Sequence, residues 1–304
     1  MKQKSKIKRF TARTARALFQ LFPENHMLSV SEYQIESAKI PKSFDGFRIC
    51  HLSDLHSHRF GKDNVRLLRR VADSKPDLVV LTGDMVSRTD SDYSVFLSFA
   101  QVLAKQYPVF YVIGNHEQTM GRAALKAFLN RLRKLGIRVL NNEKTELCRG
   151  GESLPVYGMW YPLKYYKEAR HIGKHERFRL RDMHRAMGGV DPDRFCILLT
   201  HNPLSFPVYA RWGADLTLCG HVHGGMIRLP FVGGLLSPER RFFPQYSEGV
   251  YTMEEKKMVV SRGLGSGVFG PRIHNVPEVV NLTLRSVPGG GNNRFEKGVF
   301  KREG

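Results

Sequence analysis

Eight side chains able to bind a metal ion or transfer a proton follow five short apolar segments of this sequence. They are Asp54, His56, Asp84, Asn115, His116, His201, His221 and His223. Carboxylate, imidazole and amide groups are ligands for Mn²⁺, Fe or Zn²⁺. In Asp54-Leu-His56, and again in His221-Val-His223, both side chains would point to one side of an extended segment and reach the same ion. The set is large enough to bind two ions if one carboxylate bridges them.

The order of these residues resembles the sequence pattern of the calcineurin-like metallophosphoesterases. The five blocks of that pattern are matched by Asp54-Leu-His56, Gly83-Asp84, Gly114-Asn-His-Glu117, Thr200-His201 and Gly220-His-Val-His223. The resemblance runs from about residue 33 to residue 284. Residues 44–48, 223–228 and 261–265 look like the bacterial subgroup of small, often membrane-associated phosphodiesterases.

The resemblance implies a four-layer α/β/β/α sandwich with a dinuclear metal centre. It assigns Asp54, His56 and His223 to the first ion, Asn115, His201 and His221 to the second, and Asp84 to a bridge between them. His116 would protonate the leaving oxygen or stabilise charge on the phosphoryl group. Two ions can generate hydroxide for in-line attack on phosphorus. We therefore expect a hydrolase with two metal ions, manganese being favoured and iron or zinc being the alternatives.

Other polar residues near these blocks leave alternatives open. Glu117 either orients a neighbouring group or is a surface carboxylate, and His51 is expected to pack within the first strand. Four arginines are candidates for binding phosphate oxygens, because a guanidinium makes bidentate contacts with them, or are plain surface cations. They are Arg59, Arg228, Arg262 and Arg272.

The apolar segments predict the strands that position these residues. Residues 78–81 are apolar without alternation, which indicates a strand covered on both faces. Strands near 47–52, 78–81 and 109–113 alternate with helices near 62–74, 92–105 and 121–135, so we expect βαβ units and a parallel sheet. Ligands gather beyond the carboxyl ends of such strands. Further strands are expected at 137–140, 145–148, 155–159, 196–199, 216–219, 250–261 and 279–284.

Two finer expectations concern side chains in these elements. In the helix near 62–74, Val65, Leu68 and Val71 would share the buried face. The four cysteines lack any Cys-x-x-Cys pairing and are expected to be reduced core thiols, which fits a reducing compartment. They are Cys50, Cys148, Cys196 and Cys219.

The charge balance and the chain ends indicate a basic protein with one enzyme domain. There are 48 Lys and Arg against 28 Asp and Glu, a net charge of +20, which favours an anionic partner. Residues 1–26 form a basic amphipathic arm in our interpretation, with a disordered arm or an export signal as alternatives. Residues 27–286 form the metallophosphoesterase domain, in which 161–189 is either a lid or a solvated loop with a helix, and 287–304 form a flexible tail.

No segment reaches the roughly 20 apolar residues that a membrane span requires. We therefore expect a monomeric, cytoplasmic protein that lies peripherally on the inner face of the cell membrane, with the arm on the anionic surface.

The favoured function is hydrolysis of a phosphodiester or pyrophosphate bond in a phosphorylated small molecule or lipid-linked substrate, such as a UDP-acylglucosamine. A nuclease or cyclic-nucleotide phosphodiesterase is the alternative, although no base-stacking motif supports a nucleic-acid partner. A binding module that has lost catalysis would be expected to have broken the ligand pattern, whereas all eight positions are present.

Overall fold

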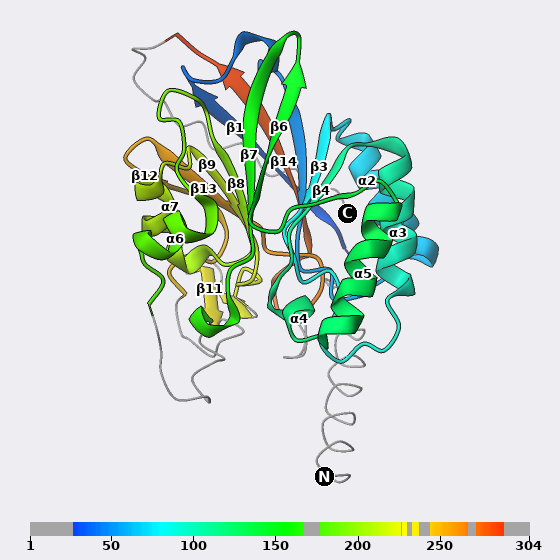
Figure 1. Cartoon of the computed structure of the whole chain (residues 1–304). Helices are drawn as coiled ribbons and strands as arrows, with labels where there is room; N and C mark the ends of the chain where they lie inside the picture. The colour runs from blue at the N-terminus through cyan, green and yellow to red at the C-terminus, as the bar shows by residue number, and fades with distance from the viewer. Residues whose placement is uncertain are drawn as a thin grey trace.

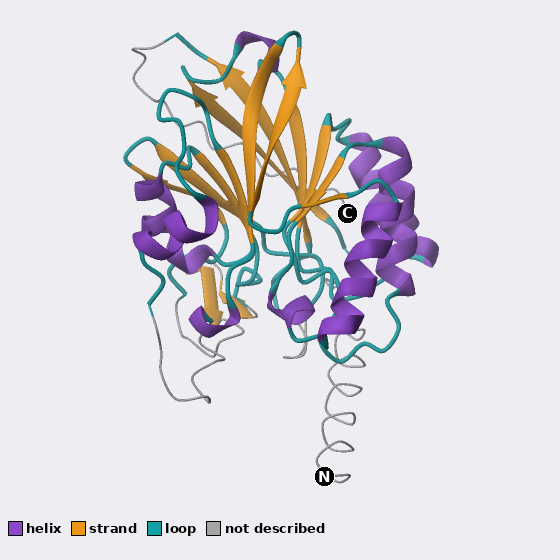
Figure 2. Cartoon of the chain, in the orientation of Figure 1, coloured by secondary structure: helices purple, strands orange, loops and turns teal. Residues whose placement is uncertain are grey.

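The computed structural model describes residues 27–166, 177–225, 227–229, 233–236, 244–266 and 272–288. Within them, two six-stranded sheets pack face to face and each carries helices on its outer face (Figures 1 and 2). The expected arm 1–26, the middle of the expected lid, 167–176, and the tail from residue 289 lie outside the described residues.

The first sheet contains the expected βαβ units. Its strand order is β1 (Ser29–Ser37), β14 (Glu278–Ser286), β2 (Arg48–Leu52), β3 (Leu78–Leu81), β4 (Val109–Tyr111) and β5 (Arg138–Val139). Strands β2 to β5 are parallel, and β14 runs antiparallel to β2. The connections contain α2 (Val65–Asp73), α3 (Ser94–Gln106) and α5 (Arg122–Lys134), which cover the outer face (Figure 1), while the short α4 (Asn115–Gln118) follows β4 directly.

The second sheet is built from the later part of the chain. Its strand order is β12 (Gly249–Met253), β13 (Lys256–Val260), β9 (Leu216–Cys219), β8 (Ile197–Thr200), β7 (Glu152–Met159) and β6 (Glu143–Arg149). The four central strands are parallel and both edge strands are antiparallel to their neighbours. Helices α6 (Leu180–Met187) and α7 (Phe206–Trp212) cover its outer face (Figure 2). The remaining elements are the hairpin β10 (Ile227–Leu229) and β11 (Gly233–Leu236) and the 3₁₀ turns Lys42–Phe44, Lys62–Asn64, Leu163–Tyr165 and Pro203–Ser205.

Strand β3 shows why its apolar run lacks alternation. Leu78 and Val80 pack into the core between the two sheets, whereas Val79 and Leu81 pack into the core beneath the helices of the first sheet. Separate clusters fill the space between the second sheet and its helices. The expected α/β/β/α sandwich is therefore confirmed, and burial of both faces holds the central strands and their carboxyl ends in place.

Two side-chain expectations were wrong. Val65 is 51% exposed, and α2 buries Leu67 and Val71 instead. Val65 is the first residue of the helix and directly follows the left-handed Asn64. Cys148 is exposed while the other three cysteines are buried, since it lies on the edge strand β6. Among the described residues, no helix has the length and hydrophobicity needed to span a membrane.

Candidate metal centre

The loops after β2, β3, β4, β8 and β9 meet at one end of the molecule, the lower end in Figure 1. All eight residues singled out from the sequence are buried there. Seven of them fall into three overlapping groups whose ligand atoms lie within 4.8 Å of one another. The eighth, Asn115, lies beside His116, whose backbone N–H donates to Asp84 Oδ1 over 2.8 Å.

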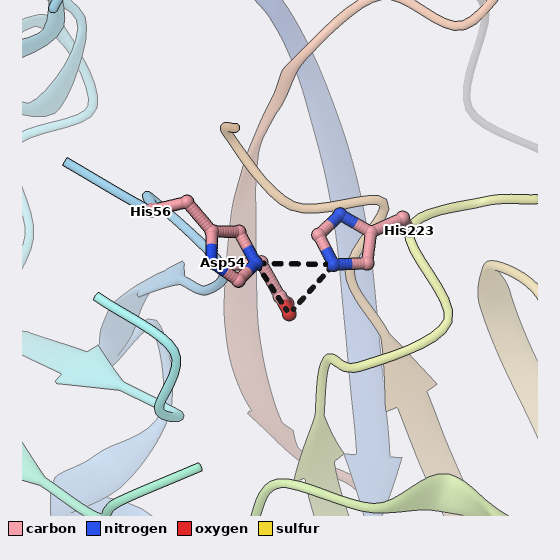
Figure 3. Close-up of side chains that lie close together, drawn as sticks. All are labelled: Asp54, His56 and His223. Atoms are coloured by element: carbon pink, nitrogen blue, oxygen red, sulfur yellow. Dashed lines mark hydrogen bonds and ion pairs between the residues drawn. The ribbon is translucent and has the colours of Figure 1, made fainter. Parts of the chain in front are cut away.

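The first group is Asp54, His56 and His223 (Figure 3). His223 Nε2 is 3.3 Å from Asp54 Oδ1 and 3.2 Å from His56 Nε2, and the two imidazole rings stack with centroids 5.0 Å apart. Burial lowers the pKa of His223 to about 3 and that of His56 well below its usual value. Both rings are therefore neutral at pH 7, the form in which imidazole binds metal ions.

The tautomer of His223 directs a lone pair at this group. Its Nδ1 lies 3.1 Å from the carbonyl oxygen of Gly265 and 3.3 Å from Arg272 Nη2, and donation to the carbonyl oxygen leaves Nε2 without a proton. The bare Nε2 and the Asp54 carboxylate oxygen then face each other at 3.3 Å as two acceptors. Such an arrangement is stabilised by a cation between them, and the residues therefore fit a metal ion.

The second group is Asp84, His201 and His221. His201 Nδ1 donates to the carbonyl oxygen of Thr82 over 2.6 Å, which leaves Nε2 facing Asp84 Oδ2, 3.2 Å away. His201 Nε2 and Asn115 Oδ1 are both buried and have no hydrogen-bond partner among the described residues. A metal ion would satisfy both atoms.

Asp84 lies between the two groups. Its Oδ2 is 4.0 Å from His56 Nε2 and 3.9 Å from His116 Nε2, in addition to its contact with His201. Burial disfavours charge on Asp84, but the imidazoles of His201 and His116 outweigh it and lower the pKa well below the usual value. Burial likewise opposes charge on His201, while Asp84 and Asp54 raise its pKa to about 10. A metal ion would compete with that proton.

The ligand segments are not extended, contrary to the expectation from the sequence. Five of the eight residues have left-handed φ angles: Asp54 54°, His56 48°, Asp84 53°, His221 75° and His223 55°. The backbone twist also separates His221 and His223, which belong to different groups rather than to one. Left-handed conformations are costly for residues other than glycine and persist where the surroundings hold them.

Hydrogen bonds hold this strained backbone in place. The N–H of His221 donates to Asp54 Oδ2 over 3.0 Å, and the N–H of His56 donates to the carbonyl oxygen of Asp84 over 3.0 Å. Close approach between loops adds to this, since a Cβ atom on Gly83 would lie 2.3 Å from the Gly114 nitrogen. Only glycine fits where the β3 and β4 loops touch.

Glu117 is a buried carboxylate that joins these two loops. It accepts the N–H groups of Asp84 (2.9 Å), Met85 (2.7 Å) and Gly114 (2.9 Å). Burial and the Asp84 carboxylate raise its pKa to about 7. The alternative that Glu117 is a surface carboxylate is excluded, because its side chain is fully buried. By anchoring both loops, it fixes Asp84 relative to Asn115 and His116.

His116 and Arg88 place two donors side by side. The backbone N–H of Arg88 donates to His116 Nδ1 over 3.1 Å, so Nε2 carries the proton of the neutral ring. Arg88 Nη2 lies 3.1 Å from that Nε2, so the guanidinium and the imidazole lie side by side. An anionic oxygen beside them would accept from both. The sequence analysis missed Arg88, although an arginine four residues after Asp84 was a visible signal.

Three of the four arginines considered from the sequence have structural partners. Arg262 makes ion pairs with Glu278 and Glu248, and Arg228 pairs with the same Glu248. Arg272 is fully buried and donates to the carbonyl oxygens of Arg262 and Gly265. These contacts tie the segments after β9 and β13 together behind the first group.

His51 and Arg59 differ in their surroundings. His51 is buried in β2, as expected, and its Nε2 lies 2.8 Å from Thr82 Oγ1. Arg59 is exposed and lines a small cavity of about 140 Å³ with Asn64 and Ser94.

Comparisons with known proteins agree with this geometry. The sequence profile of the calcineurin-like phosphoesterase family matches residues 47–225. An uncharacterized metallophosphoesterase of Aquifex aeolicus (strain VF5) is 33% identical over 269 residues, which cover 86% of this chain and 94% of that protein. The phosphodiesterase YaeI of Escherichia coli (strain K12) is 29% identical over 78% of this chain and 82% of its own.

A third relative is the UDP-2,3-diacylglucosamine pyrophosphatase LpxG of Chlamydia muridarum (strain MoPn / Nigg), which is 24% identical over 79% of this chain and 85% of its own. The matched family profile spans all five sequence blocks, and these blocks meet in one buried cluster of potential metal ligands. For these reasons the chain belongs to the calcineurin-like phosphoesterase family and is a phosphoester hydrolase.

Proposed function

We propose that this protein is a dinuclear metal-dependent hydrolase of phosphodiester or pyrophosphate bonds. The single observation that carries the proposal is the position of Asp84, which shares ligand groups with residues of both sheets. The ligand roles divide as follows: Asp54, His56 and His223 for one ion, Asn115, His201 and His221 for the other, and Asp84 for both. Manganese is the favoured ion, with iron or zinc as alternatives, since this donor set accepts all three.

The side chains of the site have separate tasks in the proposed reaction. Bound ions would supply an activated hydroxide and neutralise charge on the phosphoryl group. His116 donates the Nε2 proton, fixed by the Arg88 backbone N–H, to the leaving oxygen as general acid. The Arg88 guanidinium binds an oxygen of the same group. Glu117 keeps the loops that carry Asp84 and His116 in register.

The proposed substrate is a lipid-linked or nucleotide-sugar phosphate at a membrane surface. The names of two relatives, a phosphodiesterase and a UDP-2,3-diacylglucosamine pyrophosphatase, support diester or diphosphate chemistry. The net charge of +20 supports attraction to an anionic surface. We propose a peripheral position on the inner face of the cell membrane, with residues 1–26 as the contact.

Hydrolysis of two model esters tests the proposed reaction. Metal-stripped protein is resupplied with Mn²⁺, Fe²⁺ or Zn²⁺ and assayed with bis-p-nitrophenyl phosphate and p-nitrophenyl phosphate, while bound metal is measured by elemental analysis. We expect two ions per chain and preferential, metal-dependent cleavage of the diester. His116→Ala should retain both ions and lose about 100-fold or more in kcat. Two bound ions without hydrolysis of either ester or of a nucleoside diphosphate would contradict the proposal.

Vesicle co-sedimentation tests the membrane part separately. The full chain should bind vesicles that contain anionic lipid and should be released by salt, because the attraction is electrostatic. A chain that lacks residues 1–22 should bind much less. Equal binding by both chains would contradict the role of the arm, without touching the proposed chemistry.

A further inference from the structure

Tyr166 is a buried tyrosine at the edge of the second ligand group. It follows the 3₁₀ turn Leu163–Tyr165 in the connection from β7 to α6 and is 2% exposed. Its ring meets the His221 ring edge-on, with centroids 5.0 Å apart, and lies 6.5 Å from the His201 ring. The side chain therefore forms part of the wall around Asp84, His201 and His221.

The hydroxyl of Tyr166 has no hydrogen-bond partner among the described residues, although it is buried. Two tyrosines of the same aromatic cluster are satisfied: Tyr209 donates to the carbonyl oxygen of Asn202 over 2.9 Å, and Tyr161 Oη lies 2.7 Å from Ser205 Oγ. Burial of an unpartnered hydroxyl costs free energy, and phenylalanine would fill the same space without that cost. A ligand that accepts from the hydroxyl would account for its presence.

Tyr166 borders the second ligand group, because its ring meets the His221 ring edge-on and lies near the His201 ring. A phenol has an ordinary pKa near 10 and is a donor at neutral pH. The group that it meets must be an acceptor.

We propose that Tyr166 Oη donates a hydrogen bond to a non-bridging phosphoryl oxygen of the substrate, on the His201–His221 side of the site. This inference rests on the proposed function. His116 and Arg88 approach Asp84 from the first sheet, so Tyr166 would be a third donor that arrives from the second sheet. The phosphoryl group would then have donors on both sides. Tyr166 is in this sense a catalytic residue, since it touches the reacting group.

The test compares Tyr166→Phe with Tyr209→Phe in the full chain loaded with Mn²⁺. The first variant removes a hydroxyl that has no hydrogen-bond partner among the described residues, whereas the second removes a satisfied one from the same cluster. Binding of inorganic phosphate is measured by calorimetry, hydrolysis of bis-p-nitrophenyl phosphate by kinetics, Tm by calorimetric scanning and bound metal by elemental analysis. Phosphate binding and Tm do not depend on turnover.

We expect Tyr166→Phe to keep two ions and an unchanged or higher Tm, to weaken phosphate binding about 10-fold and to lower kcat/KM about 10- to 100-fold. Tyr209→Phe should lower Tm and leave phosphate affinity unchanged. Equal phosphate affinity and kcat/KM in wild type and Tyr166→Phe would overturn the inference. Loss of a metal ion in Tyr166→Phe would also overturn it, because the residue would then support a ligand.

The outcome separates this inference from the proposed function. A wild-type protein that binds phosphate but hydrolyses neither ester counts against the proposed function, and the difference in phosphate affinity still decides the role of Tyr166. A metal-loaded wild type that binds no phosphate at all contradicts both.

Discussion

The two sheets contribute different chemistry to the same site. The first sheet supplies both carboxylates, the amide, the imidazole of His56 and the proposed proton donor through the loops after β2, β3 and β4, whereas the second supplies imidazoles alone. The loops of the first sheet are cross-linked by Glu117 and by contact between Gly83 and Gly114. The imidazole of His201 from the second sheet is oriented by a carbonyl oxygen of the first, that of Thr82. The carboxylate charges of the site and the cross-links between its loops therefore belong to the first sheet.

The largest effect should distinguish a carboxylate of the first sheet from an imidazole of the second. Asp84→Asn removes the charge shared by both groups, so we expect kcat to fall at least about a thousandfold and one or both ions to be lost. His201→Gln removes one neutral ligand, and we expect metal affinity to fall about 10- to 100-fold, with activity recovered at high metal concentration. Measurement of kcat against metal concentration checks both variants. If high metal concentration restored the activity of Asp84→Asn, the proposed difference between the carboxylate and the imidazole would be contradicted.

Glu117→Gln should loosen the two loops of the first sheet that Glu117 joins. The amide nitrogen of glutamine would face N–H groups that now meet a carboxylate oxygen, which leaves donors opposed in a buried space. We expect the free energy of unfolding to fall by about 2–4 kcal/mol and metal affinity to fall with it. Urea unfolding checks this, with the exposed Glu143→Gln as the matched control. An unchanged unfolding midpoint would show that Glu117 does not hold the loops.

Arg88 allows side-chain and backbone contributions to be separated. Arg88→Ala keeps the backbone N–H that fixes the His116 tautomer and removes only the guanidinium. We expect kcat/KM for the diester to fall about 10- to 100-fold and Arg88→Lys to recover only part, because an ammonium group lacks the planar fork. Arg133→Ala, on the exposed face of α5, is the control. Full recovery by lysine would mean that charge alone matters.

The smallest effect concerns pH and the buried His51 of the first sheet. Burial lowers its pKa from 6.5 to about 3, so the unfolded chain binds a proton that the folded chain excludes. The resulting stability is complete above pH 6.5 and is lost as pH falls towards 3, by up to about 1.4 kcal/mol per pH unit. His51→Asn should lose stability less steeply between pH 6.5 and 5 in urea unfolding of the metal-free protein. Parallel curves would contradict this.

Much of the site could be predicted because its signal is local. Short apolar runs that end in Gly-Asp, Gly-Asn-His-Glu or Gly-His-x-His are visible in the sequence, and the rule that parallel strands end at one edge of a sheet brings them together. Arg88 and Tyr166 were not predicted as residues of the site, because an arginine in a loop and a tyrosine in an aromatic segment have many ordinary explanations. Val65 and Cys148 show the same limit, since their exposure depends on the start of a helix and the edge of a sheet.

The sequence by itself determined the family, the four-layer architecture and the eight polar residues of the site, since strand periodicity and strand-end chemistry are properties of neighbouring residues. Only the tertiary structure decided how those residues are held in place. The backbone at five of them is left-handed rather than extended, Glu117 is buried between two loops, and the Tyr166 hydroxyl is buried without a hydrogen-bond partner among the described residues. The reason is that side-chain direction and hydrogen-bond satisfaction depend on contacts between segments far apart in the chain.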